Sequence, residues 1–371
     1  MTSIGPKAYI HTDRLKQNLW NIRRHIGDRK LVCVVKANAY GHGALEISKV
    51  LSKEPGIIFA VFAFEEAIEL RDNGIDNEIL IFSRIQPELI SKASELNFTL
   101  NACAMADLKA LSDFHVKTGV CPTFHLKFDT GMTRLGFDVS EAHTVFTFIV
   151  NNHLNPEGIY SHFSTADEGD LSYAEFQLGQ FNAIVEKGKN TGINFKYVHC
   201  SNSGAILNLP NAYFNMIRVG MLLYGVLPSD EVPMVISSLE PVMSFCGPIV
   251  NVRKVPPGTQ VSYGGVFTTE KETNIAVVQA GFADGFPRAW YEKGFVGYKG
   301  QTYKIAGRVC MDQFMVDFGD VEPDEGEEVL FFGKKDGNEI AVETIAREIN
   351  TTTYVLLTAI HGRTERIVIN N

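Results

Sequence analysis

Several side chains able to do chemistry stand at the ends of short apolar runs. Lys36 follows LVCVV, Asp129 and Arg134 follow TFHLKF, His162 follows GIYS, and Arg218 lies within NMIRV. A lysine removed from water has a lowered pKa and becomes an amine nucleophile that can form a Schiff base with an aldehyde. This is the chemistry that pyridoxal phosphate requires.

A phosphate group could be held by two further segments. The segment SNSG at 201–204 offers a hydroxyl and free backbone N–H groups at the start of a helix, and Gly220 allows close approach of a second loop. The ordinary alternative is a plain helix N-cap, which Ser and Asn supply widely. Taken singly, His162, Arg134 and Arg218 are also compatible with structural roles, although a guanidinium within an apolar run needs a buried partner.

These residues need elements that bring them to one place. Eight apolar runs with helical stretches between them predict a parallel (β/α)8 barrel, whose reactive groups lie beyond the carboxyl ends of the strands and whose last two loops commonly bind phosphate. The runs are 31–35, 57–62, 78–82, 98–102, 123–128, 158–161, 197–200 and 215–219.

The pattern changes after residue 235. Short β-like runs punctuated by Pro and Gly follow, among them PIVNVRKVPPGTQVSYGG and GQTYKIAGRV. We therefore expect an α/β chain with a barrel over residues 1–235 and a mainly-β domain over residues 236–371.

Composition excludes several classes of protein. The 371 residues are 45% apolar, enough for a large core, and carry a net charge of −9, which disfavours nucleic acid as a partner. No signal peptide is visible, and no apolar run approaches the roughly 18 residues that cross a bilayer, so a cytoplasmic location without a membrane partner is expected. The six cysteines have no metal-ligand spacing, so they are expected to be reduced and no metal site is expected.

Eight motifs in this order across nearly the whole chain resemble bacterial alanine racemase, a fold-type III pyridoxal phosphate enzyme. They are VVKANAYGHG, LKFDTGMTRLGF, HFSTAD, HCSNSGA, IRVGMLLYG, VSYGG, GFADGFPR and GRVCMDQ. The resemblance implies a homodimer that interconverts L-alanine and D-alanine, the latter for peptidoglycan. It also implies that Lys36 binds the cofactor and shares proton transfer with Tyr263 of the partner subunit, because inversion needs a group on each face of Cα.

The resemblance also assigns the cofactor contacts. Arg218 faces the pyridine nitrogen, which then stays unprotonated and suits racemisation better than transamination. His162, hydrogen-bonded towards Arg218, would supply the cationic network that makes a tyrosine a usable base. The implied phosphate ligands, with Asn202 beside them, are Tyr40, Ser203, Gly220 and Tyr354.

The substrate contacts follow from the same resemblance. Arg134 is implied near the cofactor phenolic oxygen and the substrate carboxylate, and the Met311 backbone of the partner chain reaches that carboxylate. Lys127 matches a lysine that can be carbamylated to hold Arg134, and Asp312 is a supporting residue or a plain turn residue.

Two positions depart from the family pattern. Phe282 stands where tyrosine is common, so it lacks the hydroxyl that would close a hydrogen-bond chain through His199. The C-terminal stretch AIHGRTERIV lacks the usual Arg-Val-Pro.

Other functions predict other residues. A diamino acid decarboxylase of the same fold predicts a carboxylate at position 218 and a cysteine near Tyr263 in the sequence, and neither is present. A non-catalytic cofactor carrier would need Lys36 and the phosphate loops but neither Tyr263 nor the second domain. A purely structural barrel explains none of the motifs. Serine or broad-specificity racemases share these motifs, so the preferred side chain stays open.

Overall fold

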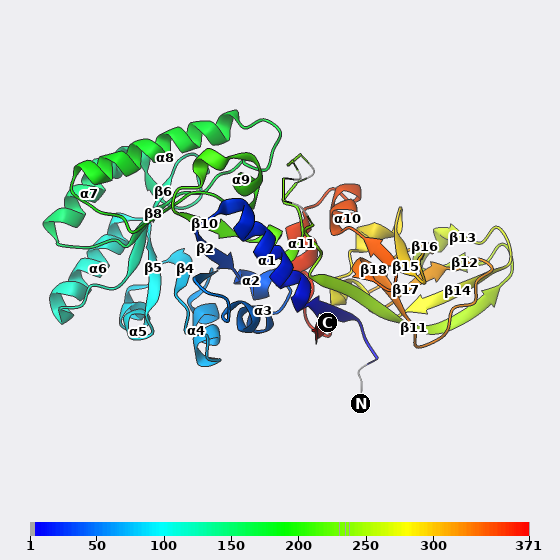
Figure 1. Ribbon diagram of the computed structural model, residues 1–371. Coiled ribbons are helices and arrows are strands. Elements are labelled where there is room, and N and C mark those ends of the chain that lie inside the picture. The colour runs from blue at the N-terminus through cyan, green and yellow to red at the C-terminus, as the bar shows by residue number, and fades with distance from the viewer. Residues whose placement is uncertain (1–3, 230, 234, 237, 371) are drawn as a thin grey trace.

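The computed structural model describes residues 4–229, 231–233, 235–236 and 238–370. A helix-rich part and a strand-rich part lie side by side, with α1 (Thr12–Ile26) near their junction (Figure 1). In the described ranges, no helix combines the length and the apolar character needed to cross a bilayer.

The helix-rich part is a barrel of eight parallel strands, in the order β10-β2-β3-β4-β5-β6-β8-β9. The Arg218 N–H donates to the Ser201 carbonyl (3.3 Å) where β9 and β10 meet, so the ring is nearly closed. Each predicted apolar run contributes one strand, and the barrel prediction is confirmed. The strands are β2 (Lys30–Val34), β3 (Ile57–Val61), β4 (Ile79–Arg84), β5 (Phe98–Ala102), β6 (Phe124–Asp129), β8 (Gly158–Tyr160), β9 (Tyr197–His199) and β10 (Met216–Val219).

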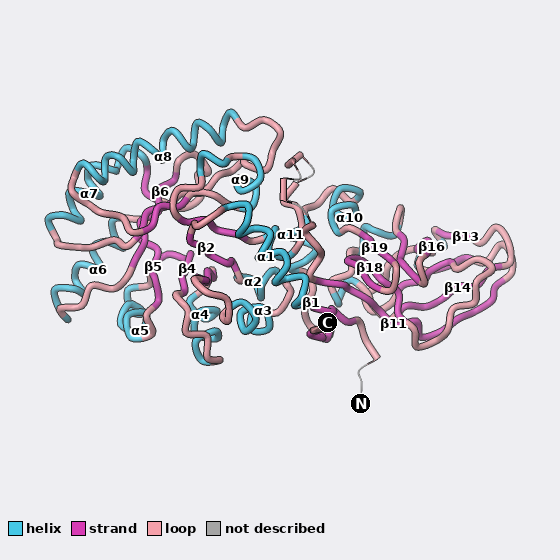
Figure 2. Tube along the Cα trace, in the orientation of Figure 1, coloured by secondary structure: helices cyan, strands magenta, loops and turns pink. Residues whose placement is uncertain are grey.

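Helices cover the outside of this barrel (Figure 2). Strands β3 and β5 are buried at every residue, as expected for parallel strands covered on both faces. The helices are α3 (Ala44–Leu51), α4 (Phe64–Asp72), α5 (Ile90–Glu95), α6 (Met105–Thr118), α7 (Ala142–Asn151), α8 (Ser172–Asn190) and α9 (Ser203–Asn208). The two-residue β7 (Phe137–Asp138) pairs with β6.

The strand-rich part is a sheet of order β19-β18-β15-β16-β17-β14-β11-β1-β20. Because β18 also pairs with β11, six of its strands form a closed antiparallel ring, and the mainly-β prediction is confirmed. Its strands are β1 (Lys7–His11), β11 (Met243–Val255), β14 (Thr273–Val278), β15 (Phe295–Tyr298), β16 (Gln301–Ile305), β17 (Phe314–Asp317), β18 (Glu328–Lys335), β19 (Asn338–Ile340) and β20 (Glu365–Ile369). A separate hairpin joins β12 (Gln260–Val261) to β13 (Phe267–Thr268).

Two segments cross between the parts. Strand β1 precedes the barrel in the chain but pairs with β11 and β20 of the second sheet. In the other direction, α10 (Val342–Glu348) and α11 (Thr353–Thr358) follow the sheet strands, and α11 lies against the segment after Lys36. The domain boundary after residue 235 stays a prediction. Strand β1 precedes this boundary in the chain, whereas its partners β11 and β20 follow it.

Candidate active site

A cavity of about 560 Å³ lies at the carboxyl ends of the barrel strands. Phe62, Phe82, Leu135 and Tyr160 form part of its wall. The cavity brings together ten of the residues that the sequence singles out. They are Lys36, Tyr40, Lys127, Arg134, His162, Asn202, Ser203, Arg218, Gly220 and Tyr354.

Lys36 lies just beyond the end of β2 and begins an unusual turn. The next four residues, Ala37 to Tyr40, all have φ between 51° and 53°, so this stretch is a turn of left-handed helix built without glycine. Such a conformation costs roughly 1–2 kcal/mol per residue, and it persists only where surrounding contacts hold it. The pKa of Lys36 is lowered by burial and then by Arg134 and Arg218, which favours the neutral amine.

The side of the cavity beyond this turn carries hydroxyl groups. Gly220 N–H donates to Ser203 Oγ (3.2 Å), and a Cβ at Gly220 would lie 2.8 Å from the Tyr40 hydroxyl. The rings of Tyr40 and Tyr354 are 5.8 Å apart. Burial raises the pKa of Tyr40, and it raises that of Tyr354 to about 12, so both remain hydrogen-bond donors at neutral pH.

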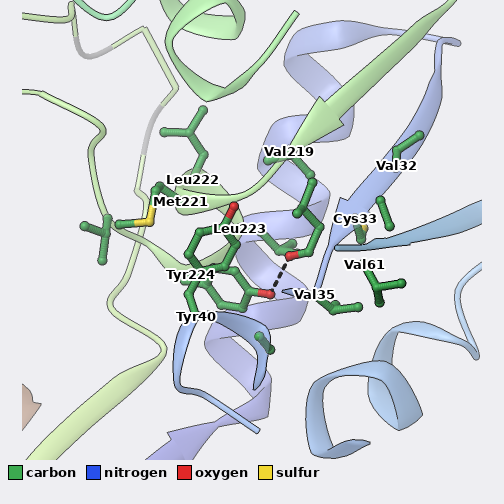
Figure 3. Close-up of a cluster of buried hydrophobic side chains, with 14 of the residues drawn as sticks. Val32, Cys33, Val35, Tyr40, Val61, Val219, Met221, Leu222, Leu223 and Tyr224 are labelled. Carbon is green, nitrogen blue, oxygen red and sulfur yellow. Dashed lines mark hydrogen bonds between the residues drawn. The ribbon is translucent and has the colours of Figure 1, made fainter. Parts of the chain in front are cut away.

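The ring of Tyr224 packs against the ring of Tyr40 (Figure 3). The two rings are 5.4 Å apart, and the Tyr224 hydroxyl donates to the Val34 carbonyl (2.9 Å) in β2. His42 also stacks on the Tyr224 ring, and the two ring centroids are 4.4 Å apart. The aromatic packing therefore fixes the left-handed turn against the barrel wall.

Arg218 is 3% exposed and lies at the centre of the site. Its Nη2 donates to the carbonyls of Ser161 (2.8 Å) and Cys200 (3.1 Å) and to His162 Nδ1 (3.1 Å), while Nη1 donates to His199 Nδ1 (2.8 Å). These bonds use the terminal nitrogens and leave Nε for another acceptor. Because a guanidinium only donates, Nδ1 of each histidine must be the accepting nitrogen.

The hydrogen-bond chain from Arg218 continues inside the barrel. His199 Nε2 and His125 Nδ1 are 3.0 Å apart, and His125 Nε2 lies 3.9 Å from Glu157 Oε2. Both ring nitrogens of His199 are thus engaged within this chain, and Phe282 has no hydroxyl with which to join it.

His162 is a neutral acceptor in this arrangement. Burial and then Arg218 lower its pKa well below the ordinary value. The cation of the network is therefore Arg218 and not His162.

Lys127 is 7% exposed and has neither a hydrogen-bonding nor an ion-pairing side chain next to it among the residues described here. Its ammonium faces the Tyr160 ring, 5.5 Å from the centroid. Burial lowers its pKa to about 8, with Arg218 and Arg134 acting in the same direction. A lysine without a counter-ion between two arginines needs an explanation, and a negative charge on its nitrogen would supply one.

Asp129 shapes the loop that carries Arg134. Its two carboxylate oxygens accept the backbone N–H groups of Gly131 (2.9 Å), Thr133 (3.0 Å) and Arg134 (2.7 Å). Burial acts to raise the pKa of Asp129, but these N–H groups outweigh it and the pKa is lowered. Sequence reasoning named Asp129 without this role.

Three predicted site residues lie outside the cavity, on the second sheet. Tyr263, Met311 and Asp312 are exposed, Tyr263 to 69%. Their loops are tied together, since Ser262 Oγ donates to the Arg308 carbonyl (2.6 Å) and the Ala283 N–H to that of Met311 (3.1 Å). A single chain therefore carries two separate groups of predicted site residues.

The unusual C-terminal stretch contributes to the second group. Arg363 pairs with the buried carboxylate of Asp284 (2.9 Å) and with Asp312 (2.8 Å). This contact was not expected from the sequence, although an arginine close to the end of the chain was visible there.

All six cysteines are free. Cys310 Sγ lies 3.7 Å from Ser262 Oγ, so a cysteine is close to the Tyr263 loop in space although none is close in sequence. Its presence weakens the argument against a decarboxylase that rested on the lack of a cysteine near Tyr263. The other argument, that position 218 carries an arginine and not a carboxylate, still holds.

Comparison with known proteins decides between these readings. The sequence models of the alanine racemase N-terminal and C-terminal domains match residues 10–228 and 242–368. The chain belongs to the alanine racemase family. It is 38% identical to the alanine racemase of Desulforamulus reducens over 98% of both chains, and 36% identical to that of Carboxydothermus hydrogenoformans over 98% of this chain and 99% of the relative.

Solved alanine racemase structures agree with this assignment. The Clostridium difficile enzyme superposes with a TM-score of 0.93 at 34% identity, over 100% of this chain and 97% of the other. The Streptomyces coelicolor enzyme gives 0.94 at 31% identity, over 99% of both. This alanine racemase family member is accordingly an isomerase that acts on a small amino acid.

Proposed function

We propose that this chain interconverts L-alanine and D-alanine with pyridoxal phosphate, using Lys36 of one subunit and Tyr263 of its partner in a homodimer. The observation that carries the proposal is Arg218, buried in the cavity that also holds Lys36, with both terminal nitrogens committed to four acceptors. The proposed product, D-alanine, would serve peptidoglycan synthesis. A cytoplasmic location stays part of the proposal.

The residues of the cavity fit the cofactor. Lys36 offers a neutral amine for an aldehyde, and Arg218 Nε is left to donate to a ring nitrogen. Tyr40, Ser203 and Tyr354 offer hydroxyls to a phosphate, with Asn202 beside them. The absence of a side chain at Gly220 leaves room that a Cβ would fill. Bound pyridoxal phosphate would withdraw electrons from Cα of the amino acid and make its proton removable.

The protein side chains then divide the work of inversion. Lys36 takes or gives the Cα proton on one face, and Tyr263 of the partner subunit does so on the other. Arg134 binds the substrate carboxylate, together with the Met311 backbone of the partner, and Asp129 holds the Arg134 loop in shape. Arg218 cannot give up its proton, so it keeps the ring nitrogen unprotonated and favours reprotonation over side reactions.

Carbamylation of Lys127 belongs to the same proposal. Its neutral amine would join CO₂ and release a proton, which leaves a carbamate anion between Arg134 and Arg218. The low pKa of Lys127 and the absence of an ion-pair partner for it among the described residues support this step.

The direct test is to incubate the purified full chain with pyridoxal phosphate and L-alanine and to follow D-alanine by chiral chromatography. We expect equal amounts of the two forms at equilibrium. A panel of L-amino acids, with L-serine and a diamino acid included, separates the alternatives. Faster inversion of serine would change the substrate, and release of CO₂ from the diamino acid without inversion of alanine would refute the proposal.

A further inference from the structure

The left-handed turn after Lys36 is held by a carboxylate from another barrel loop. Glu66 Oε1 accepts the Ala37 N–H (2.7 Å), which belongs to the first residue of the turn. No side chain within the turn itself provides this acceptor. Glu66 is only partly buried and belongs to α4, which follows the next barrel strand, β3.

The second oxygen of the same carboxylate makes an ordinary helix cap. Glu66 Oε2 accepts the N–H groups of Phe62 (2.8 Å) and Ala63 (3.0 Å) at the start of α4. A carboxylate at the third helical position often caps a helix in this way. The cap needs only one oxygen, so the bond to Ala37 is an additional contact that joins the loop after β3 to the turn after β2.

Asp107 offers a natural comparison within the same barrel. Its Oδ2 caps α6 through the N–H groups of Cys103 and Ala104 (both 3.0 Å), and its Oδ1 pairs with Arg84 (3.0 Å). Both helices therefore have a carboxylate cap at the same position. Only Glu66 extends its free oxygen to the backbone next to Lys36.

The bond to Ala37 has a direct consequence for Lys36. The peptide plane that carries the Ala37 N–H also contains the Lys36 carbonyl, so its orientation fixes the Lys36 backbone. The charged groups that act on the Lys36 amine are Arg134, Arg218 and Glu66, and Lys36 in turn acts on His162. Among the groups acting on Lys36, Glu66 alone is an anion, and it opposes the effect of the two arginines.

We infer that Glu66 is a positioning residue for Lys36: its carboxylate holds the strained turn through the Ala37 N–H and so aims the lysine amine into the cavity. This role rests on the proposed function of Lys36. It goes beyond a helix cap because loss of the cap alone would not disturb the turn.

The test compares four variants of the full chain, each prepared with and without pyridoxal phosphate. Glu66→Asp keeps the charge but is one methylene shorter, so it can still cap α4 while it falls short of Ala37. Glu66→Gln keeps the length but must turn an NH₂ group towards an N–H donor. Asp107→Asn makes the same acid-to-amide change at a matched cap elsewhere in the barrel, and Glu65→Gln changes an exposed neighbour on α4.

Two readouts separate positioning from stability. Hydrogen exchange at the Ala37 amide, measured in the chain without cofactor, reports the turn directly. We expect exchange to accelerate at least about tenfold in both Glu66 variants, as loss of one charge-assisted hydrogen bond implies, and kcat for alanine to fall by a similar factor with a smaller change in KM. Both control variants should stay within about twofold of the wild type on both measures, since neither touches the turn.

Several results would overturn the inference. One is unchanged Ala37 exchange or unchanged kcat in Glu66→Asp, and another is an equal effect of Asp107→Asn. If Glu66→Gln fails to fold, Glu66→Asp decides. A wild-type chain that does not racemise alanine would instead refute the proposed function, while the exchange result would still report whether Glu66 holds the turn.

Discussion

Lys36, which is partly buried, and Lys127, which is buried, line one cavity, yet their surroundings suit different tasks. Lys36 stands at the end of a strand on a strained turn and has its pKa lowered by burial and by two arginines. Lys127 lies within β6, where no described residue forms an ion pair with it, although the Asp129 carboxylate still acts to raise its pKa. We therefore assign nucleophilic and proton-transfer chemistry to Lys36 and an electrostatic role to Lys127.

Lys36→Ala is expected to abolish both racemisation and covalent retention of pyridoxal phosphate, because one amine would serve as nucleophile and as proton-transfer group. The measurement is activity together with cofactor retained after borohydride reduction and denaturation. A variant that still retained the cofactor covalently would show that another lysine carries it.

Lys127→Met is expected to stabilise the chain at neutral pH when bicarbonate is absent. The folded-state pKa of Lys127, about 8, lies below its unfolded value. The unfolded chain therefore holds a proton that the folded chain lacks above about pH 8, and stability rises with pH from there to about 10.5. Below about pH 8 the full cost of the buried ammonium remains, at most on the order of 3 kcal/mol.

Urea unfolding of both chains, at about pH 7 and about pH 10, measures this difference, which should shrink at the higher pH. Added bicarbonate should stabilise the wild type and leave Lys127→Met unchanged if Lys127 is carbamylated. Equal stability of the two chains at neutral pH without bicarbonate would contradict the burial of an unpaired ammonium.

Three barrel strands each contribute one polar side chain to the hydrogen-bond chain that includes Arg218. Arg218 comes from β10, His199 from β9 and His125 from β6. This hydrogen-bond chain ends near Glu157, which lies just before β8. The His125 ring occupies the space over Gly158, where a Cβ would come within 2.7 Å of it. Gly158 is therefore required by packing and not by a turn.

Gly158→Ala is expected to cost about 1–3 kcal/mol, because the added methyl overpacks the barrel interior and displaces His125. The measurement is the urea midpoint of unfolding, with activity followed in parallel. Gly179→Ala in α8 is the matched control, since nothing lies within 4 Å of its added Cβ and a helix gains about 0.5–1 kcal/mol from the change. A neutral Gly158→Ala would mean that the His125 ring moves aside freely.

At the scale of the whole chain, the cavity and the exposed group around Tyr263 are separate in one subunit. The exposure of Tyr263 and Met311 is high for large apolar side chains, as is typical of a surface that another chain covers. A two-fold dimer would place this group of each subunit over the cavity of the other.

Mixing inactive Lys36→Ala chains with inactive Tyr263→Phe chains should then restore activity. After random exchange about half the dimers are mixed and each has one intact site, so about a quarter of the wild-type rate is expected. Verified subunit exchange without recovery would place both residues in the site of one chain. Full activity of a monomer, established by light scattering at the assay concentration, would exclude the shared site independently.

The sequence by itself determined the barrel, the mainly-β region and the residues at the strand ends. Burial on both faces makes parallel strands uniformly apolar, and this pattern is local, so eight runs gave eight strands. Chemistry at the carboxyl ends follows from the geometry of any such barrel, which is why ten predicted residues share one cavity.

Only the tertiary structure decided the contacts between distant segments. Strand β1 pairs with β20, more than 350 residues away in the chain, and α11 returns Tyr354 to the barrel. Glu66 acts on Lys36, and the hydrogen-bond chain from His199 to Glu157 supports Arg218. Both arrangements depend on which loops and strands become neighbours in the fold. The left-handed turn likewise has no local signal, because Ala-Asn-Ala-Tyr adopts it only where contacts from elsewhere in the fold offset its strain.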